Sequence, residues 1–189
     1  MLVLASSSPR RQQLLQDAGI QFEIRPADVD ETPMNGELVQ DYTMRLAGTK
    51  AQTVAEPGET VLGADTAVVI AGKILGKPKT GQEAVAMLNL LSGKTHQVAT
   101  AVYVLYKNKT RSFIETTLVR FRDINEKEIL AYIDNDKPFD KAGAYGIQAG
   151  ASKFVEHIEG CYFNVVGLPI ARVYTLLRSL PYSEKYMSY

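Results

Sequence analysis

The segment Leu4 to Arg11 reads LASSSPRR and brings three serines and two arginines together at the end of an apolar stretch. Ser8 is expected to cap a helix that begins at Pro9, because serine favours the N-cap and proline the first helical position. Free N–H groups at a helix N-terminus and the guanidinium groups of Arg10 and Arg11 bind phosphate oxygens well. The segment therefore predicts a phosphate site, and the alternative is an ordinary capped helix with solvated arginines.

Asp65 interrupts the apolar run VLGADTAVV with a carboxylate. Burial of such a charge is costly unless a metal, a cation or a reaction requires it. The alternative is an Asx-type turn residue between two strands. Glu31, in an acidic loop, could share a divalent cation with Asp65, although a solvated carboxylate in a turn is the ordinary interpretation of such a residue.

Three lysines lie beside glycines and prolines that are typical of loops. They are Lys50, Lys77 in GKPK and Lys141 in FDKAGAYGIQ. Each by itself would be interpreted as a surface lysine. Their combined presence beside these loops favours a phosphate site.

Several familiar nucleotide and hydrolase motifs are excluded by their spacing. SGKT at 92–95 is not a P-loop, because Leu88 occupies the position where that motif needs a glycine. Gly143 and Gly146 do not fit GxGxxG, and the sequence contains no GxSxG. The GKT is interpreted as a helix stop.

Histidine and cysteine offer little further chemistry. His96 and His157 are candidate acid–base groups, but a histidine beside a strand is more often a surface residue or a satisfied buried one. Cys161 is the only cysteine, so an intrachain disulfide is excluded. The chain has only two histidines to add to this cysteine, so a tetrahedral zinc site formed by cysteine and histidine is not expected.

Length and composition indicate an ordinary globular protein. The chain has 189 residues, of which 46% are hydrophobic, and it forms one domain or two closely packed lobes. Lys and Arg total 21 and Asp and Glu total 21, so no overall field favours nucleic acid or a membrane surface as a partner. The amino terminus lacks a secretory pattern and no run is long enough to span a bilayer, which favours the cytoplasm.

The hydrophobic periodicity predicts an α/β fold in which a mixed, twisted sheet is flanked by helices. Helices are expected at 9–18, 38–54, 81–92, 126–133 and 167–180. Extended segments are expected at 20–24, 60–64, 66–70, 74–75, 97–106 and 112–121, with a final hairpin formed by 153–158 and 161–165. The whole chain, 1–189, is interpreted as one domain, with 182–189 as a loose tail.

Six motifs in order along the chain resemble those of the Maf family. They are SSSPRR at 6–11, GADT at 63–66, GKP at 76–78, LSGKTHQV at 91–98, DKAGAYGIQ at 140–148 and VVGLP at 165–169. The resemblance implies a Maf/ITPase-like fold with two lobes around a cleft, and a homodimer. It implies a hydrolase of acid anhydrides in phosphorus-containing compounds, which converts a nucleoside triphosphate to the monophosphate and pyrophosphate. A link to septum formation and arrest of cell division is also implied.

The resemblance assigns roles to the residues already singled out. Asp65 is the expected proton acceptor, and Glu31 is its acidic partner in holding a divalent metal, Mg²⁺ or Mn²⁺. The expected substrate-binding residues are Ser8, Arg10, Arg11, Lys50, Lys77 and Lys141.

Three positions that distinguish branches of the family read Arg10, Thr66 and Gln148 in this chain. This combination is similar to the branch that acts on dTTP and UTP, with modified pyrimidine nucleotides as further candidates. The Gln148 carboxamide can both donate to and accept from the O4 and N3 edge of uracil or thymine. Its alternative role is that of a loop residue that bonds backbone groups.

Two other functions remain as alternatives. A non-catalytic regulator of septum formation would bind triphosphates with the same cations, but it would not need Asp65 as a base. A binder of single-stranded nucleic acid would need a basic groove with interleaved aromatic residues, which the neutral charge and the absence of tryptophan disfavour.

Overall fold

The computed structural model describes residues 1–107, 109–181 and 186–187. In this part of the chain a seven-stranded sheet has the order β2-β1-β3-β5-β6-β7, and β4 pairs with β3. The strands are β1 Leu2–Leu4, β2 Phe22–Ile24, β3 Thr60–Ile70, β4 Lys73–Leu75, β5 Thr95–Tyr106, β6 Lys109–Phe121 and β7 Val155–Glu159. β1 is parallel to β2 and β3, whereas β4 is antiparallel to β3 and β7 to β6. The predicted mixed α/β class is confirmed.

The chain divides into two compact units. Unit 1 comprises Met1–Asp65, Thr100–Glu115 and Gly167–Tyr189, and unit 2 comprises Thr66–Ala99 and Thr116–Val166. The strands β3, β5 and β6 each contribute residues to both units. No helix among the described residues has the length and apolar character needed to cross a bilayer.

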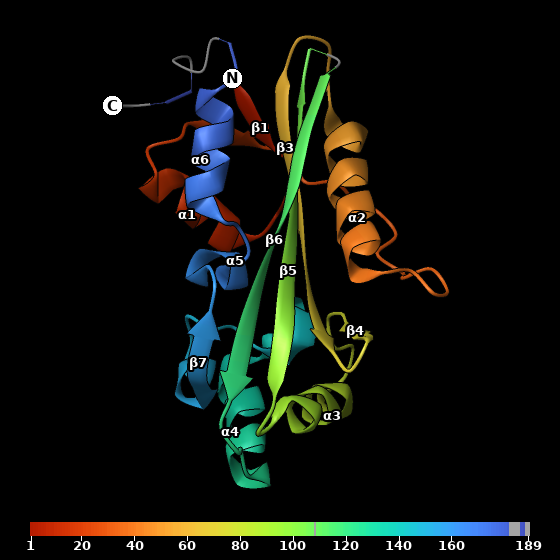
Figure 1. Ribbon diagram of the computed structural model, residues 1–189, viewed down its shortest axis with the longest axis vertical. Helices are drawn as coiled ribbons and strands as arrows, with labels where there is room; N and C mark the ends of the chain where they lie inside the picture. Colours follow the sequence, from red (N-terminus) through yellow and green to blue (C-terminus); the bar gives the residue numbers. More distant parts are fainter. Residues whose placement is uncertain (108, 182–185, 188–189) are drawn as a thin grey trace. The chain divides into compact units, whose positions relative to one another are not determined.

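Unit 1 contains the helices α1 Pro9–Asp17, α2 Val39–Val54 and α6 Ile170–Arg178. Figure 1 shows α2 on one side of the unit 1 strands and α1 and α6 on the other. A fully buried cluster joins β1, the residue that follows it, β3 and α2, and consists of Val3, Ala5, Ala51 and Val61. Small side chains in this cluster let α2 lie close to the sheet.

Unit 2 contains the helices α3 Gly81–Leu91, α4 Glu126–Asp136 and α5 Tyr162–Val166. Short 3₁₀ segments lie at Pro138–Asp140, Ala142–Ala144 and Gly150–Phe154. The Thr80 side chain caps α3, and Asn125 forms a capping box with Glu128 at the start of α4, as the sequence predicts. Gly93 follows α3 with a φ of 67°, so the expected stop at GKT is also confirmed.

The predicted final hairpin is wrong in its second half. Residues 153–158 overlap β7, which pairs with β6, but Tyr162–Val166 is a helix. The Asn164 side chain is fully buried and donates to the Val98 carbonyl and to Thr117 Oγ1, 3.0 Å each. These two bonds satisfy the NH2 group of the buried side-chain amide, so tertiary contacts override the local β propensity.

Two smaller expectations also change. Residues 60–64 and 66–70 form the single strand β3, which runs through Asp65 without a turn, so the Asx-turn alternative is wrong. Of the segment 182–189, only Tyr186 and Met187 are described, and both are buried. Met187 bridges Ile20, and the Gln21 N–H donates to the Tyr186 carbonyl at 2.8 Å. The other residues of the expected tail lie outside the described residues.

Candidate active site

Asp65, Lys50 and Glu31 meet in unit 1. Lys50 Nζ lies 2.6 Å from Asp65 Oδ1 and 2.7 Å from Glu31 Oε1, so one ammonium group bridges two carboxylates. The side chains of Lys50 and Asp65 are each 9% exposed, whereas that of Glu31 is 35% exposed. Lys50 is therefore not a surface lysine, and the charge of Asp65 has the buried cation that its burial requires.

A close approach of α2 to β3 makes this contact possible. A Cβ built on Gly63 would lie 2.1 Å from the Ala47 carbonyl oxygen and 3.0 Å from Ala51 Cβ. Gly63 and Asp65 share one face of β3, because side chains alternate along a strand. The missing side chain at Gly63 thus lets α2 approach closely enough for Lys50 to reach Asp65.

The protonation of Asp65 is set by opposing influences. Burial raises the pKa of the Asp65 carboxyl, while Lys50 and Arg11 oppose that rise through their positive charges. The pKa remains above its usual value. A carboxylate of raised basicity is suited to accept a proton at neutral pH.

Arg11 is a buried cation whose donors are directed at the protein itself. Its Nε donates to the Gly167 carbonyl at 2.8 Å, and its Nη1 donates to the Ala64 carbonyl at 2.8 Å and to Ser6 Oγ at 3.2 Å. It is 8% exposed, so the solvated-arginine alternative is wrong for this residue. Arg11 connects α1 to the β3 residue that precedes Asp65 and contributes positive charge near that carboxylate.

The helix start that carries Arg10 differs from the prediction at Ser8. Ser8 is the N-cap residue of α1, but its side chain makes no capping bond. Its N–H instead donates to Ser6 Oγ at 3.2 Å. The conformation is a tight serine turn rather than a side-chain cap, and Arg10 is half-buried in the first helical turn.

The remaining predicted site residues belong to unit 2. Thr66 is half-buried on β3, while Lys77 and Gln148 are exposed. The Gly143 N–H donates to the Gly76 carbonyl at 3.0 Å, so the loop that carries Lys77 is bonded to the loop that carries Lys141. Lys141 is paired with Asp140 at 2.5 Å.

The sequence did not reveal the residues that hold these loops in place. In unit 2, His96 Nε2 lies 2.8 Å from Tyr145 Oη, and the Gly146 N–H donates to Tyr132 Oη at 3.1 Å. His96 is thus a buried histidine with a hydrogen-bond partner, as one of the two alternatives from the sequence had it. His157 is exposed on β7. Aromatic residues in loops and helices are ordinary core residues by pattern, so no sequence signal marked these bonds.

The donor set suits a hard divalent cation. Asp65 and Glu31 offer carboxylate oxygens, which Mg²⁺ and Mn²⁺ prefer, and Mg²⁺ typically uses one or two carboxylates plus substrate phosphates and water. No group of three or more acidic, histidine or cysteine side chains is close enough to hold a metal in the described part of the chain. Asp65 and Glu31 are therefore the side chains that could serve as protein ligands of such a cation.

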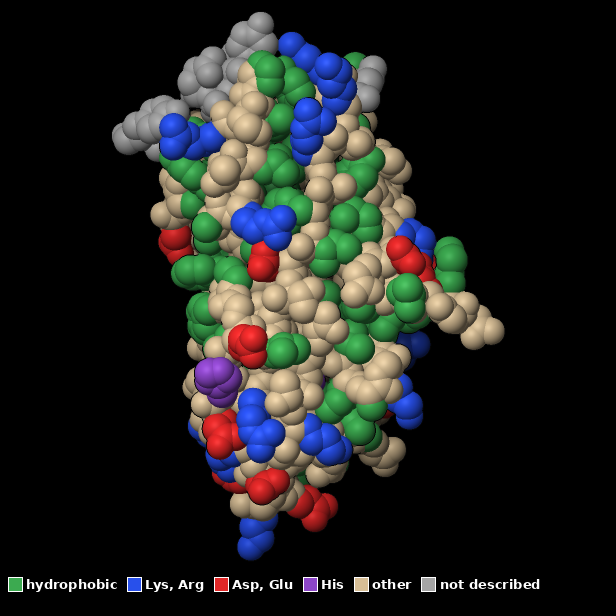
Figure 2. Space-filling model, viewed as in Figure 1, with side chains coloured by type: hydrophobic (Ala, Val, Ile, Leu, Met, Phe, Trp, Pro, Cys, Tyr) green, Lys and Arg blue, Asp and Glu red, His purple; other side chains and the backbone are tan. Residues whose placement is uncertain are grey.

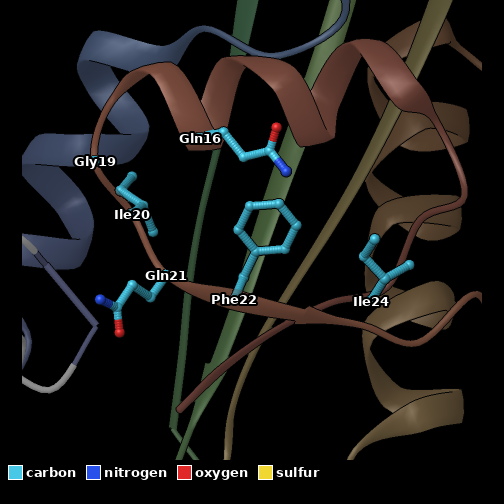
Figure 3. A pocket seen from close by; sticks show the side chains of 6 residues that line it. All are labelled: Gln16, Gly19, Ile20, Gln21, Phe22 and Ile24. Atoms are coloured by element: carbon cyan, nitrogen blue, oxygen red, sulfur yellow. The ribbon is translucent and has the colours of Figure 1, made fainter.

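The pocket drawn in Figure 3 shares no lining residue with the cluster of Lys50, Asp65 and Glu31. It has a volume of about 460 Å³ and lies in unit 1 between α1 and β2. Its lining consists of Gln16, Gly19, Ile20, Gln21, Phe22 and Ile24. No predicted site residue is among them.

The fold and the site define a mixed α/β protein with a buried lysine–aspartate pair on its sheet, and comparison identifies the family. A family model described as "Maf-like protein" matches residues 1–180, so the chain belongs to the Maf family. A protein named dTTP/UTP pyrophosphatase from a strain of Bacillus cereus is 51% identical over 174 residues, 91% of each chain. One of the same name from Citrifermentans bemidjiense is 49% identical over 181 residues, 94% of each chain.

Proposed function

We propose that this protein hydrolyses dTTP and UTP to the monophosphate and pyrophosphate. The observation that carries the proposal is the buried Asp65 carboxylate with Lys50 Nζ at 2.6 Å. The names of the relatives, dTTP/UTP pyrophosphatase, support the same activity.

Asp65 is the proton acceptor in this proposal. It orients a water molecule and takes one of its protons as the oxygen attacks phosphorus. The anhydride bond between the α and β phosphates breaks, and pyrophosphate leaves. The raised pKa of Asp65, caused by its burial, supports this role.

The cations stabilise charge on the phosphates. Lys50 neutralises charge beside Asp65, and Arg10, Lys77 and Lys141 contact the triphosphate oxygens. Arg11 acts mainly by holding Ala64 in place and by its positive charge, because its Nε and Nη1 donate to protein groups. Preorganised cations of this kind dominate catalysis of phosphoryl chemistry.

A divalent metal, Mg²⁺ or Mn²⁺, is part of the proposal. Asp65 and Glu31 would hold it. When bound, it would supply positive charge that stabilises the phosphate oxygens and would lower the pKa of a water molecule.

Selection of the base is assigned to Arg10, Thr66 and Gln148. The exposed Gln148 side chain is available to pair with the O4 and N3 edge of uracil or thymine. Modified pyrimidine nucleotides that keep this edge are accepted on the same grounds. Gln148→Ala should lower kcat/KM for dTTP and UTP about tenfold, as expected for one lost hydrogen bond.

The deciding experiment incubates the purified protein with a panel of triphosphates and Mg²⁺ or Mn²⁺ and identifies the products. Monophosphate with pyrophosphate, formed fastest from dTTP and UTP, is the expected result. Diphosphate with phosphate would contradict the cleavage site. Binding without any product would favour the non-catalytic regulator of septum formation, and the link to arrest of cell division would then be its main activity.

The rival nucleic-acid function has weaker support. On the face drawn in Figure 2, hydrophobic and acidic side chains separate the basic ones, and the described side chains form no continuous basic band there. A single-strand binder needs such a band with interleaved aromatic residues.

A homodimer in the cytoplasm completes the proposal. Sedimentation equilibrium of the purified protein tests the dimer, and fractionation of cells that express the full chain tests the compartment.

A further inference from the structure

The acidic loop between β2 and α2, residues 25–38, contains neither helix nor strand, yet it delivers Glu31 to Lys50. A loop of this length costs considerable conformational entropy to order. Contacts with α2 offset part of this cost.

Two side chains of α2 bind the successive backbone carbonyls of Glu31 and Thr32. Tyr42 Oη donates to the Glu31 carbonyl at 2.9 Å, and Arg45 Nη2 donates to the next carbonyl, that of Thr32, at 3.3 Å. Tyr42 is 5% exposed, and the Arg45 guanidinium lies 5.7 Å from the centre of its ring. Two successive carbonyls of the loop are thus both bonded to one helix.

A bidentate ion pair fastens the far end of the loop. Arg45 Nε and Nη2 lie 2.6 and 2.7 Å from the two oxygens of Glu37, whose side chain is 8% exposed. Glu37 Oε2 also accepts from the Met34 N–H at 2.9 Å, and the Glu37 N–H donates to the Met34 carbonyl at 3.1 Å. The ion pair therefore closes the turn 34–37 and ties it to α2.

The spacing along α2 connects this contact with the site. Tyr42 and Lys50 are eight residues apart on one helix and lie on the same face. Tyr42 is close enough to the carboxylates of Asp65 and Glu31 that both raise its pKa, in addition to the larger effect of burial. The same helix thus fixes the Glu31 backbone and presents the ammonium group that Glu31 binds.

We infer that Tyr42, Arg45 and Glu37 form a positioning device, the loop anchor, that fixes the Glu31 carboxylate where it and Asp65 receive the divalent cation. This inference rests on the proposed function for the role of Glu31. Arg45 and Glu37 are positioning residues, because they act on Glu31 through the backbone and the turn of the loop.

The test uses hydrogen–deuterium exchange and Mn²⁺ binding on the full chain. In Arg45→Ala, exchange of the amides in 31–37 should be about tenfold faster, the effect of losing roughly 1.4 kcal/mol of hydrogen bonding. Exchange in 46–54 of α2 should stay unchanged. Mn²⁺ alone should bind about tenfold more weakly, as for other residues that orient a metal ligand.

Three further variants sharpen the result. Arg45→Lys keeps the positive charge but cannot form the bidentate contact with Glu37, and its Mn²⁺ affinity should lie between those of Arg45→Ala and the wild-type protein. Glu37→Gln removes the other side of the pair and, combined with Arg45→Ala, should add little further loss. Arg122→Ala removes a comparable bidentate ion pair in unit 2, in which Arg122 bonds Glu128 at 2.6 and 3.2 Å. It should leave amide exchange in 31–37 and the Mn²⁺ affinity unchanged.

Unchanged exchange in 31–37 of Arg45→Ala would overturn the inference. Faster exchange with unchanged Mn²⁺ affinity would overturn it equally, because the anchor would then hold a loop without serving Glu31. If the wild-type protein releases no pyrophosphate, the proposed function fails, while exchange and Mn²⁺ binding still decide the anchor. If Arg45→Ala does not fold, Glu37→Gln provides the same two measurements.

Discussion

Asp65 depends for its charge on a lysine fifteen residues earlier in the chain. Its side chain is 9% exposed in the middle of an apolar strand, where an unpaired charge would be severely destabilising. Lys50 supplies the counter-charge, and Glu31 shares it from a more exposed position. The proposed proton acceptor is therefore dependent on its neighbours for its charge.

Asp65→Asn should reduce turnover of dTTP at least a hundredfold, because the amide cannot accept the proton of the attacking water. Binding of dTTP should remain measurable by calorimetry, since the phosphate-binding cations are intact. Steady-state kinetics and calorimetry on the same preparation provide the comparison. Wild-type turnover in this variant would exclude Asp65 as the base.

Lys50→Met should destabilise the protein by about 3–5 kcal/mol near pH 8, because it leaves a buried carboxylate without its cation. With Lys50 gone, the pKa of folded Asp65 lies still further above its unfolded value. The folded state then binds the extra proton, so the deficit is smallest at acid pH and grows as the pH rises through the unfolded value.

Urea unfolding at pH 5 and pH 8 measures this effect. Lys79→Met, which removes an exposed lysine, is the matched control and should cost less than about 0.5 kcal/mol at either pH. An equal loss of stability in Lys50→Met at both pH values would argue against the buried ion pair.

At the scale of elements, the packing of α2 on β3 decides whether the site can form. Gly63 is the point of closest approach, and the space where its side chain would be is taken by the backbone of α2. A backbone atom cannot move aside as a flexible side chain can. A single methyl group added at Gly63 is therefore expected to disturb the packing of α2 on β3.

Gly63→Ala should destabilise the protein by about 1–3 kcal/mol, the usual cost of overpacking a core. It should also reduce turnover, since a shift of α2 carries Lys50 away from Asp65. Denaturant unfolding and kinetics check the two effects. Gly81→Ala is the control, because no atom lies within 4 Å of its added Cβ, and it should leave stability and turnover near wild type.

Local signals predicted some elements well and one poorly. The starts of α3 and α4 follow from Thr80 and Asn125, whose side chains cap N–H groups three residues away. The segment 161–165 has a strand-like pattern of apolar residues, yet it forms α5. Its conformation depends on the bonds of Asn164 to Val98 and Thr117, which are distant in the sequence.

At the scale of the whole molecule, stability at acid pH is expected to depend on one buried histidine. His96 is 2% exposed, and its Nδ1 has no hydrogen-bond partner among the described residues. Phe121 and Tyr145 surround the ring. Burial lowers the pKa of His96 to about 4, so the folded state holds this ring neutral.

Because burial lowers the pKa of His96, protonation of this residue favours the unfolded state. The unfolded histidine gains a proton as the pH falls below about 6.5, while the folded one does not until about pH 4. Stability is therefore fully present above pH 6.5 and is lost as the pH falls. At pH 5 the loss from His96 should be roughly 2 kcal/mol.

His96→Gln removes the titrating group and keeps a polar partner for Tyr145. The free energy of unfolding of this variant should therefore decrease less between pH 7.5 and pH 5 than that of the wild-type protein. Chemical denaturation at the two pH values measures the difference. His157→Gln alters an exposed histidine and should reproduce the wild-type pH dependence. A wild-type slope in His96→Gln would assign the acid sensitivity to other groups.

The α/β class, most helix boundaries and the choice of candidate site residues follow from the amino-acid sequence. These features depend on signals that act over a few residues, such as caps, periodicity and short motifs. It also identified Asp65 as a charge that needs a reason to be buried.

The tertiary structure alone decided what those residues contact. It paired Lys50 with both Asp65 and Glu31, turned Arg11 towards the carbonyls of Ala64 and Gly167, and tied the acidic loop to Arg45. The partners of Arg11 lie as far as 156 residues along the chain. Contacts of this kind arise from the packing of helices on the sheet, and no pattern within a short window of sequence encodes them.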